Sequence, residues 1–112
     1  MSFVGLNIPH GLYESINIAG NELAGSKRGI WTRWDGATWL KEMSVVGNRF
    51  IPNKGTDLGG GISGVGCDLG TIQGVAIAGN TFRGPASARA ILQSTGTAAV
   101  TDVGNVRIGG IS

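Results

Sequence analysis

Three tryptophans alternate with charged residues between positions 27 and 42, and this stretch has the composition of a binding site. The face of an indole ring stacks on the C–H face of a sugar, while neighbouring guanidinium and carboxylate groups bond its hydroxyls. The same residue types are enriched at the centres of protein–protein interfaces, and a tryptophan also fills a core or caps its end. Carbohydrate contact, a subunit interface or end cap, and core filling all stay open for five residues: Trp31, Arg33, Trp34, Asp35 and Trp39.

Catalytic groups are harder to find. Cleavage of a glycosidic bond uses two carboxyl groups roughly 5–10 Å apart. Among the seven Asp and Glu residues, Asp57 and Asp68 flank a glycine-rich stretch and are the weak catalytic candidates. Two solvated turn aspartates are the simpler interpretation. His10, the single histidine, has no evident nucleophile beside it. Polysaccharide cleavage is therefore the alternative function and not the main one.

No metal or cofactor is predicted. Residues 64–69 match part of a calcium-binding nonapeptide, but the match occurs once, and such sites need tandem copies. Cys67 is the only cysteine, which excludes an internal disulfide and favours a small buried apolar side chain.

The composition is that of one globular β-rich domain. Of 112 residues, 41% are apolar and 14% charged, and the 21 glycines without a collagen period indicate many tight turns. A net charge of +2 does not predict a nucleic-acid partner. No stretch approaches the roughly 20 apolar residues of a membrane span, and the N-terminus lacks signal-peptide features. We therefore expect synthesis in the cytoplasm and no membrane contact.

A repeated pattern predicts the elements that position these residues. The pattern apolar–x–apolar–x–Gly–Asn–x–apolar occurs three times, followed by a shortened fourth copy. The alternation before each glycine is typical of a β-strand with one buried face. Glycine and asparagine adopt left-handed backbone conformation at low cost, so each pair predicts a sharp corner. The corners lie at 20–21, 47–48, 79–80 and 104–105.

Local identity with variable spacing indicates a solenoid, in which each coil returns to the same place while its turns vary in length. Equivalent asparagines then lie one above another and bond through their amides. The asparagines expected to form this ladder are Asn21, Asn48, Asn80 and Asn105.

This pattern resembles the right-handed parallel β-helix of pectin-degrading enzymes and bacteriophage tailspikes. The resemblance covers roughly residues 12 to 108 and implies an all-β fold of about four coils, each with three strands. We expect one domain, 1–112, in which 1–11 leads into the repeat region 12–108. The three expected sheets hold 16–19, 43–46 and 75–78; 22–24, 49–51 and 81–83; and 29–33, 61–65 and 88–93.

The ends of such a stack need cover. Four coils at ~4.8 Å give a height of only about 20 Å, with strand edges and core exposed at both ends. No capping helix is evident, so cover is expected from the rest of a longer chain or from identical copies. Tailspikes form parallel homotrimers that short C-terminal segments lock together, and the chain is most similar to such a segment.

The resemblance thus implies a structural, trimer-forming segment of a phage tailspike-like or cell-surface-adhesion protein. It places the protein in the virion tail, as a homotrimer in contact with a bacterial surface polysaccharide. The alternative is a fragment or companion of a polysaccharide-degrading β-helix enzyme, either a lyase or a glycoside hydrolase.

Overall fold

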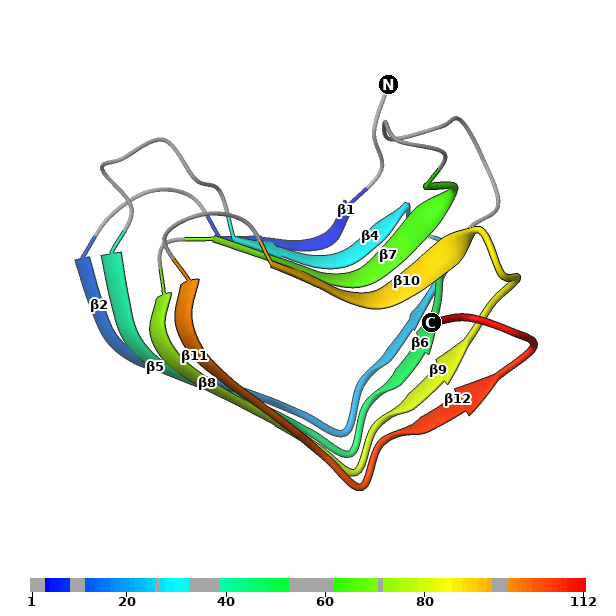
Figure 1. Ribbon diagram of the computed structural model, residues 1–112. Helices are drawn as coiled ribbons and strands as arrows, with labels where there is room; N and C mark the ends of the chain where they lie inside the picture. The colour runs from blue at the N-terminus through cyan, green and yellow to red at the C-terminus, as the bar shows by residue number, and fades with distance from the viewer. Residues whose placement is uncertain are drawn as a thin grey trace.

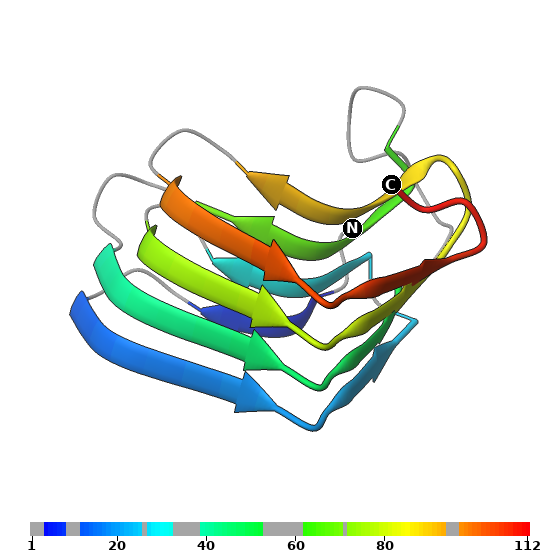
Figure 2. The same cartoon turned by 60° about the horizontal axis from the view of Figure 1, so that its bottom comes forward.

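The computed structural model describes residues 4–8, 12–25, 27–32, 39–52, 62–70, 72–93 and 97–112. In these residues the regular secondary structure is β-strand, arranged in three sheets of four parallel strands. Figure 1 looks along the stack and Figure 2 shows its side. The chain enters the three sheets in turn and then repeats the circuit, so three consecutive strands make one coil.

Each sheet takes one strand from each of the four coils. Sheet A contains β1 (Val4–Ile8), β4 (Arg28–Thr32), β7 (Gly64–Leu69) and β10 (Ala88–Gln93). Sheet B contains β2 (Leu12–Ala19), β5 (Trp39–Val46), β8 (Ile72–Ala78) and β11 (Thr97–Val103). Sheet C contains β3 (Glu22–Ala24), β6 (Arg49–Ile51), β9 (Thr81–Arg83) and β12 (Val106–Ile108). The all-β expectation is confirmed as three stacks of parallel strands, consistent with a β-helix-like fold.

The strands predicted from the repeat are confirmed in sheets B and C. Ile16, Met43 and Val75 pair in register across β2, β5 and β8. The expected ranges 22–24, 49–51 and 81–83 coincide with β3, β6 and β9. The pattern locates these strands because each one lies directly against a Gly–Asn corner.

Sheet A corrects the expected strand positions. The strand expected at 61–65 is β7, Gly64–Leu69, in which Val65 pairs with Arg28 and Cys67 with Ile30. Long-range packing selects this register, because the Phe82 ring lies against Gly66, where an added Cβ would be 2.6 Å from the ring. The segment 1–11 also contributes a strand to the stack, since β1 pairs with β4. The strand expected at 29–33 begins one residue earlier, and 88–93 is β10.

Each Gly–Asn pair turns the chain from sheet B into sheet C. The four glycines have φ between 65° and 69°, the left-handed region that favours glycine. The backbone N–H of each asparagine donates to Oδ1 of the asparagine in the next coil, from Asn21 to Asn48 at 2.8 Å, Asn48 to Asn80 at 2.8 Å, and Asn80 to Asn105 at 2.9 Å. The side-chain Nδ2 of each donates to the same oxygen. Every step of the ladder therefore runs in one direction along the stack.

The core fills the space between the sheets with apolar side chains from each coil. Phe50 and Phe82 stack with ring centroids 4.8 Å apart and planes 9° apart. Gly29 and Gly66 of sheet A leave room for these two rings. Because both phenylalanines are fully buried, the stacked pair fixes the distance between sheets A and C.

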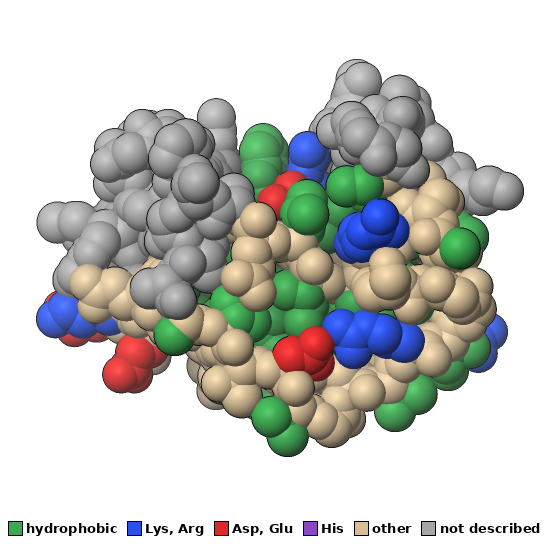
Figure 3. Space-filling view, viewed as in Figure 1, with side chains coloured by type: hydrophobic (Ala, Val, Ile, Leu, Met, Phe, Trp, Pro, Cys, Tyr) green, Lys and Arg blue, Asp and Glu red, His purple; other side chains and the backbone are tan. Residues whose placement is uncertain are grey.

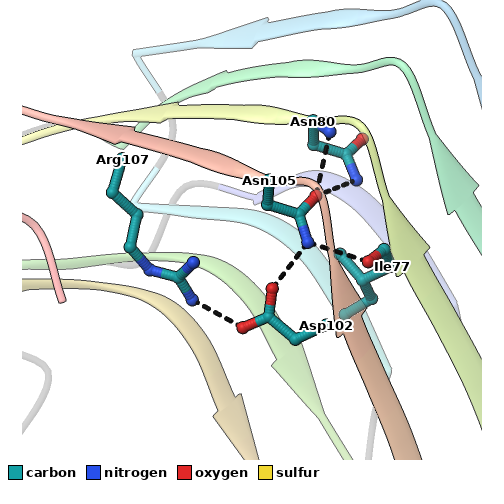
Figure 4. Close-up of polar contacts among 5 residues, drawn as sticks. All are labelled: Ile77, Asn80, Asp102, Asn105 and Arg107. Atoms are coloured by element: carbon teal, nitrogen blue, oxygen red, sulfur yellow. Dashed lines mark hydrogen bonds and ion pairs between the residues drawn. The ribbon is translucent and has the colours of Figure 1, made fainter.

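Polar groups cover part of the end of the stack at coil 4. Asp102 lies in register with the buried Ile77, and Arg107 with the buried Phe82. Arg107 Nη2 donates to Asp102 Oδ2 at 2.8 Å, and Asn105 Nδ2 donates to Asp102 Oδ1 at 2.6 Å. Figure 4 shows both side chains pointing toward Asp102. The Arg107 guanidinium lies 5.8 Å from the Phe82 ring centroid. Figure 3 shows an acidic and a basic side chain side by side at this end, next to apolar side chains that stay in view, so the expected apolar end is only partly covered.

The C-terminal residues add to this cover. Ile111 is buried and belongs to the core cluster. Ser112 joins the edge of β10, accepting from Ala90 N–H at 2.7 Å and donating to the Ala88 carbonyl at 3.4 Å. Residues 109–112 therefore belong to the folded stack, although they follow the expected repeat region.

Acid is expected to weaken the cap at coil 4. The hydrogen bond from Arg107 holds the pKa of Asp102 below its ordinary value of 3.8, and the bond from Asn105 acts in the same direction. A carboxyl whose folded-state pKa is depressed stabilises the fold above its unfolded pKa and loses that contribution as pH falls through the folded value. We expect the melting temperature to decline below about pH 4. The Asp102→Asn protein should show a shallower decline between pH 5 and pH 2, and coincident melting curves would contradict this role.

Candidate functional site

An open groove lies on the outer face of sheet B. Its volume is about 360 Å³ and it crosses all four strands of the sheet. The residues that line it are Ser15, Glu42, Met43, Ser44, Gly74, Val75, Ala76, Ala99 and Thr101. With strands ~4.8 Å apart, the groove extends about 14 Å between the first and last strand. Its length follows the stack, so it fits an extended chain better than a compact ligand.

The strand register explains why the sheet is hollowed here. Glu42 pairs with Ser15 and with Gly74, and Gly74 pairs with Ala99, so one row across the sheet has three small residues. The next row has Ser44, Ala76 and Thr101 in register. Alternate residues on these strands are buried in the core, as side chains of a strand alternate between faces. Small side chains in register produce the floor of the groove.

The groove offers hydroxyl groups and one carboxylate. Ser15, Ser44 and Thr101 carry hydroxyls, and Glu42 is the only charged residue among the lining residues that the structure describes. Ser44 Oγ donates to Asn17 Oδ1 at 2.6 Å, which leaves its oxygen lone pairs as acceptors. Such a surface can exchange hydrogen bonds with a neutral ligand that is rich in hydroxyls.

The tryptophan stretch lies only partly within the described residues. Trp31, in β4 of sheet A, is half-buried, and the Arg28 guanidinium lies 4.6 Å from its ring centroid. Arg28 Nε also donates to Asp68 Oδ2 at 2.7 Å. Trp39 begins β5 of sheet B. Arg33, Trp34 and Asp35 lie outside the described residues. Trp31 therefore belongs to a different sheet from the groove.

Of the two catalytic candidates, Asp68 lies within the described residues. Asp68 is largely buried and forms the ion pair with Arg28. Asp57 and His10 lie outside the described residues.

Burial raises the pKa of the Cys67 thiol above its usual value, and the charge of Asp102 acts in the same direction. Because a thiol reacts as its thiolate, this side chain is inert at neutral pH in the folded protein.

The described ranges contain neither a candidate metal cluster nor a candidate membrane-spanning helix. No cluster of three His, Cys, Asp or Glu side chains is placed to hold a metal ion there. No helix in the same residues is long and apolar enough to cross a membrane.

The groove residues were not predicted, although the sequence contains a pattern that indicates them. In each repeat, the outward positions alternate with the apolar positions that define the strands. Glycine, alanine and serine at these positions predict a depression once the coils are aligned. The sequence alone does not give the register between strands of neighbouring coils. A register shift of one residue would turn the small side chains toward the core.

Comparison with known protein families, curated proteins and solved structures gave no match. The function is therefore inferred from the site itself.

Proposed function

We propose that the chain is a right-handed parallel β-helix that serves as a structural segment of a tailspike-like or cell-surface-adhesion protein. The three parallel stacks, the four circuits of the chain and the asparagine ladder support this architecture. The proposal includes a homotrimer in the virion tail, as the resemblance of the sequence implies.

The proposed ligand is a bacterial surface polysaccharide, and the observation that carries this is the sheet B groove. Its length along the stack suits an extended polymer, and its hydroxyls with Glu42 suit a neutral sugar chain. This assignment moves the proposed contact from the tryptophan stretch to the outer face of sheet B.

Filling the groove tests the proposal. An added Cβ at Gly74 meets no atom closer than 3.8 Å, so the backbone leaves room for the Cβ of Gly74→Val, whose branched side chain enters the groove. We expect binding of neutral oligosaccharides from bacterial surface polysaccharides, measured by NMR titration, to weaken at least about tenfold.

Gln73→Val is the matched control, because Gln73 is exposed on the same strand and does not line the groove. Binding equal to the parent in the Gly74→Val protein would reject the groove as the site. A parent protein that binds none of these oligosaccharides would reject polysaccharide contact altogether.

The alternative of an enzyme fragment or companion has less support. Glycoside cleavage uses two carboxyl groups, and Glu42 is the one carboxylate that lines the described groove. Asp68 lies on sheet A and is paired with Arg28. Release of reducing ends from the same oligosaccharides by the parent, and its loss in Glu42→Gln, would favour the enzyme.

A further inference from the structure

The outer and inner faces of coil 4 have exchanged their usual residue types near the corner. In coil 3, Ile77 and Phe82 face the core, and in coil 4 their register positions hold Asp102 and Arg107. The outward positions of β12 hold aliphatic side chains, with Val106 53% and Ile108 39% exposed. The corresponding residues of β9 are Thr81 and Arg83. In coil 4, Asp102 and Arg107 therefore pair with each other at the end of the core, while the aliphatic side chains of Val106 and Ile108 are exposed to water.

The exposed aliphatic residues gather on both sides of one corner. Val103, 58% exposed, ends β11 just before the corner, and Val106 begins β12 just after it. Val46, 44% exposed, lies two coils away in the same row as Val103. These are the large exposed apolar side chains of the described residues, and we name the four of them the corner surface: Val46, Val103, Val106 and Ile108. Figure 1 shows the corner at the lower vertex of the coils.

We propose that the corner surface is where copies of this chain contact one another, around an axis parallel to the stack. This inference rests on the homotrimer in the proposed function and names the surface that forms it. Such an axis keeps each coil level with the same coil of the neighbouring copy. The corner end of sheet C in one copy then faces the corner row of sheet B in the next, so Val106 and Ile108 meet the row that ends in Val103. The contact removes these apolar groups from water.

Charge supports a second copy as the occupant and the parallel arrangement as its orientation. The sheet B row beside the corner is uncharged in all four coils and does not line the groove: Ala19, Val46, Ala78 and Val103. The outward-facing charged groups of sheet C, Glu22, Arg49 and Arg83, therefore meet no like charge on a parallel neighbour.

An antiparallel contact through sheet C is disfavoured by the same residues. A two-fold axis perpendicular to the stack would set coil 4 against coil 1, with Val106 facing the coil that carries Glu22. It would also bring coil 2 against coil 3, where Arg49 and Arg83 would repel each other. An antiparallel contact through sheet B alone would leave Val106 and Ile108 in water.

Molar mass in solution tests the proposal. We expect light scattering on a sizing column to give about three times 11.4 kDa for the parent. Val103→Lys and Val106→Lys should give the monomer mass at the same concentration, because identical lysines would be buried against an apolar neighbour. Both side chains are more than half exposed within one copy, so circular dichroism should show an unchanged fold. Gln93→Lys is the control, an exposed position of coil 4 on sheet A that should leave the trimer intact.

The outcomes distinguish an error in the proposed contact surface from an error in the proposed trimer. A trimer that persists in both lysine variants would overturn the corner surface and leave the proposed trimer standing. A monomeric parent would overturn self-association, while the oligosaccharide titration still tests the groove. Orientation has its own readout: on oxidation, a mixture of Val103→Cys and Val106→Cys should cross-link if the copies are parallel. Cross-links that form only when Val103→Cys is mixed with Ala19→Cys would overturn the parallel arrangement. The buried Cys67 does not compete.

Discussion

Replacing Asn80 by alanine is expected to lower the free energy of unfolding by about 3 kcal/mol, because several buried polar groups lose their partners at once. Asn80 is 1% exposed. Its Oδ1 accepts from the backbone N–H and the Nδ2 of Asn48, at 2.8 and 3.1 Å. Its Nδ2 donates to the Val45 carbonyl at 2.8 Å and to Asn105 Oδ1 at 2.9 Å. Alanine restores none of these bonds, and the small cavity it leaves gives water little access.

Urea unfolding of Asn80→Ala and Asn21→Ala provides the measurement and its control. Asn21 is at the exposed end of the ladder, and its backbone N–H keeps the bond to Asn48 Oδ1 when the side chain is removed. We expect that variant to lose less than about 1 kcal/mol. Equal losses at the two positions would mean that the ladder does not stabilise the interior of the stack.

Gly66→Ala is expected to destabilise the protein by about 3 kcal/mol through overpacking. The new Cβ would lie 2.6 Å from the Ala90 carbonyl oxygen and 2.6 Å from Cε1 of Phe82. The backbone of the next coil cannot retreat without breaking the pairing of β7 with β10, and Phe82 is held against Phe50. Neither neighbour can move to relieve the clash, so the strain lowers the stability of the folded protein.

Gly74→Ala is the matched control for this substitution. Gly74 also lies within a strand, but an added Cβ there has 3.8 Å to its nearest neighbour. We expect a melting temperature within a few degrees of the parent, as for most surface changes. A Gly66→Ala protein as stable as Gly74→Ala would contradict the close packing of Phe82 on sheet A.

The sequence was most informative where one residue has one possible role. A Gly–Asn pair after alternating apolar residues predicts a corner, and the strands on either side of each corner lie where the pattern places them. The predicted bounds of β7 were wrong because its glycine-rich surroundings are compatible with several strand positions. The position of the strand depends on the packing of the Phe82 ring on Gly66, a contact between two sheets that no local sequence pattern contains.

The groove and the corner surface depend on relations between coils. Gly74 and Ala99 become neighbours only when β8 and β11 are in register. Likewise, Asp102 looks like a surface aspartate in the sequence, and its position over Ile77 reveals it as part of the cap. Residues 25 to 32 positions apart must be aligned before either feature can be recognised.

The single direction of the asparagine ladder has a consequence for how the chain folds as it is made. The coil that leaves the ribosome first carries amide donors whose acceptor is the asparagine of the coil that follows. Each newly synthesised coil thus supplies the oxygen that its predecessor lacks, and assembly can keep pace with translation. In coil 4 the side-chain amide of Asn105 meets the Asp102 carboxylate, so an acceptor from the same coil ends the series.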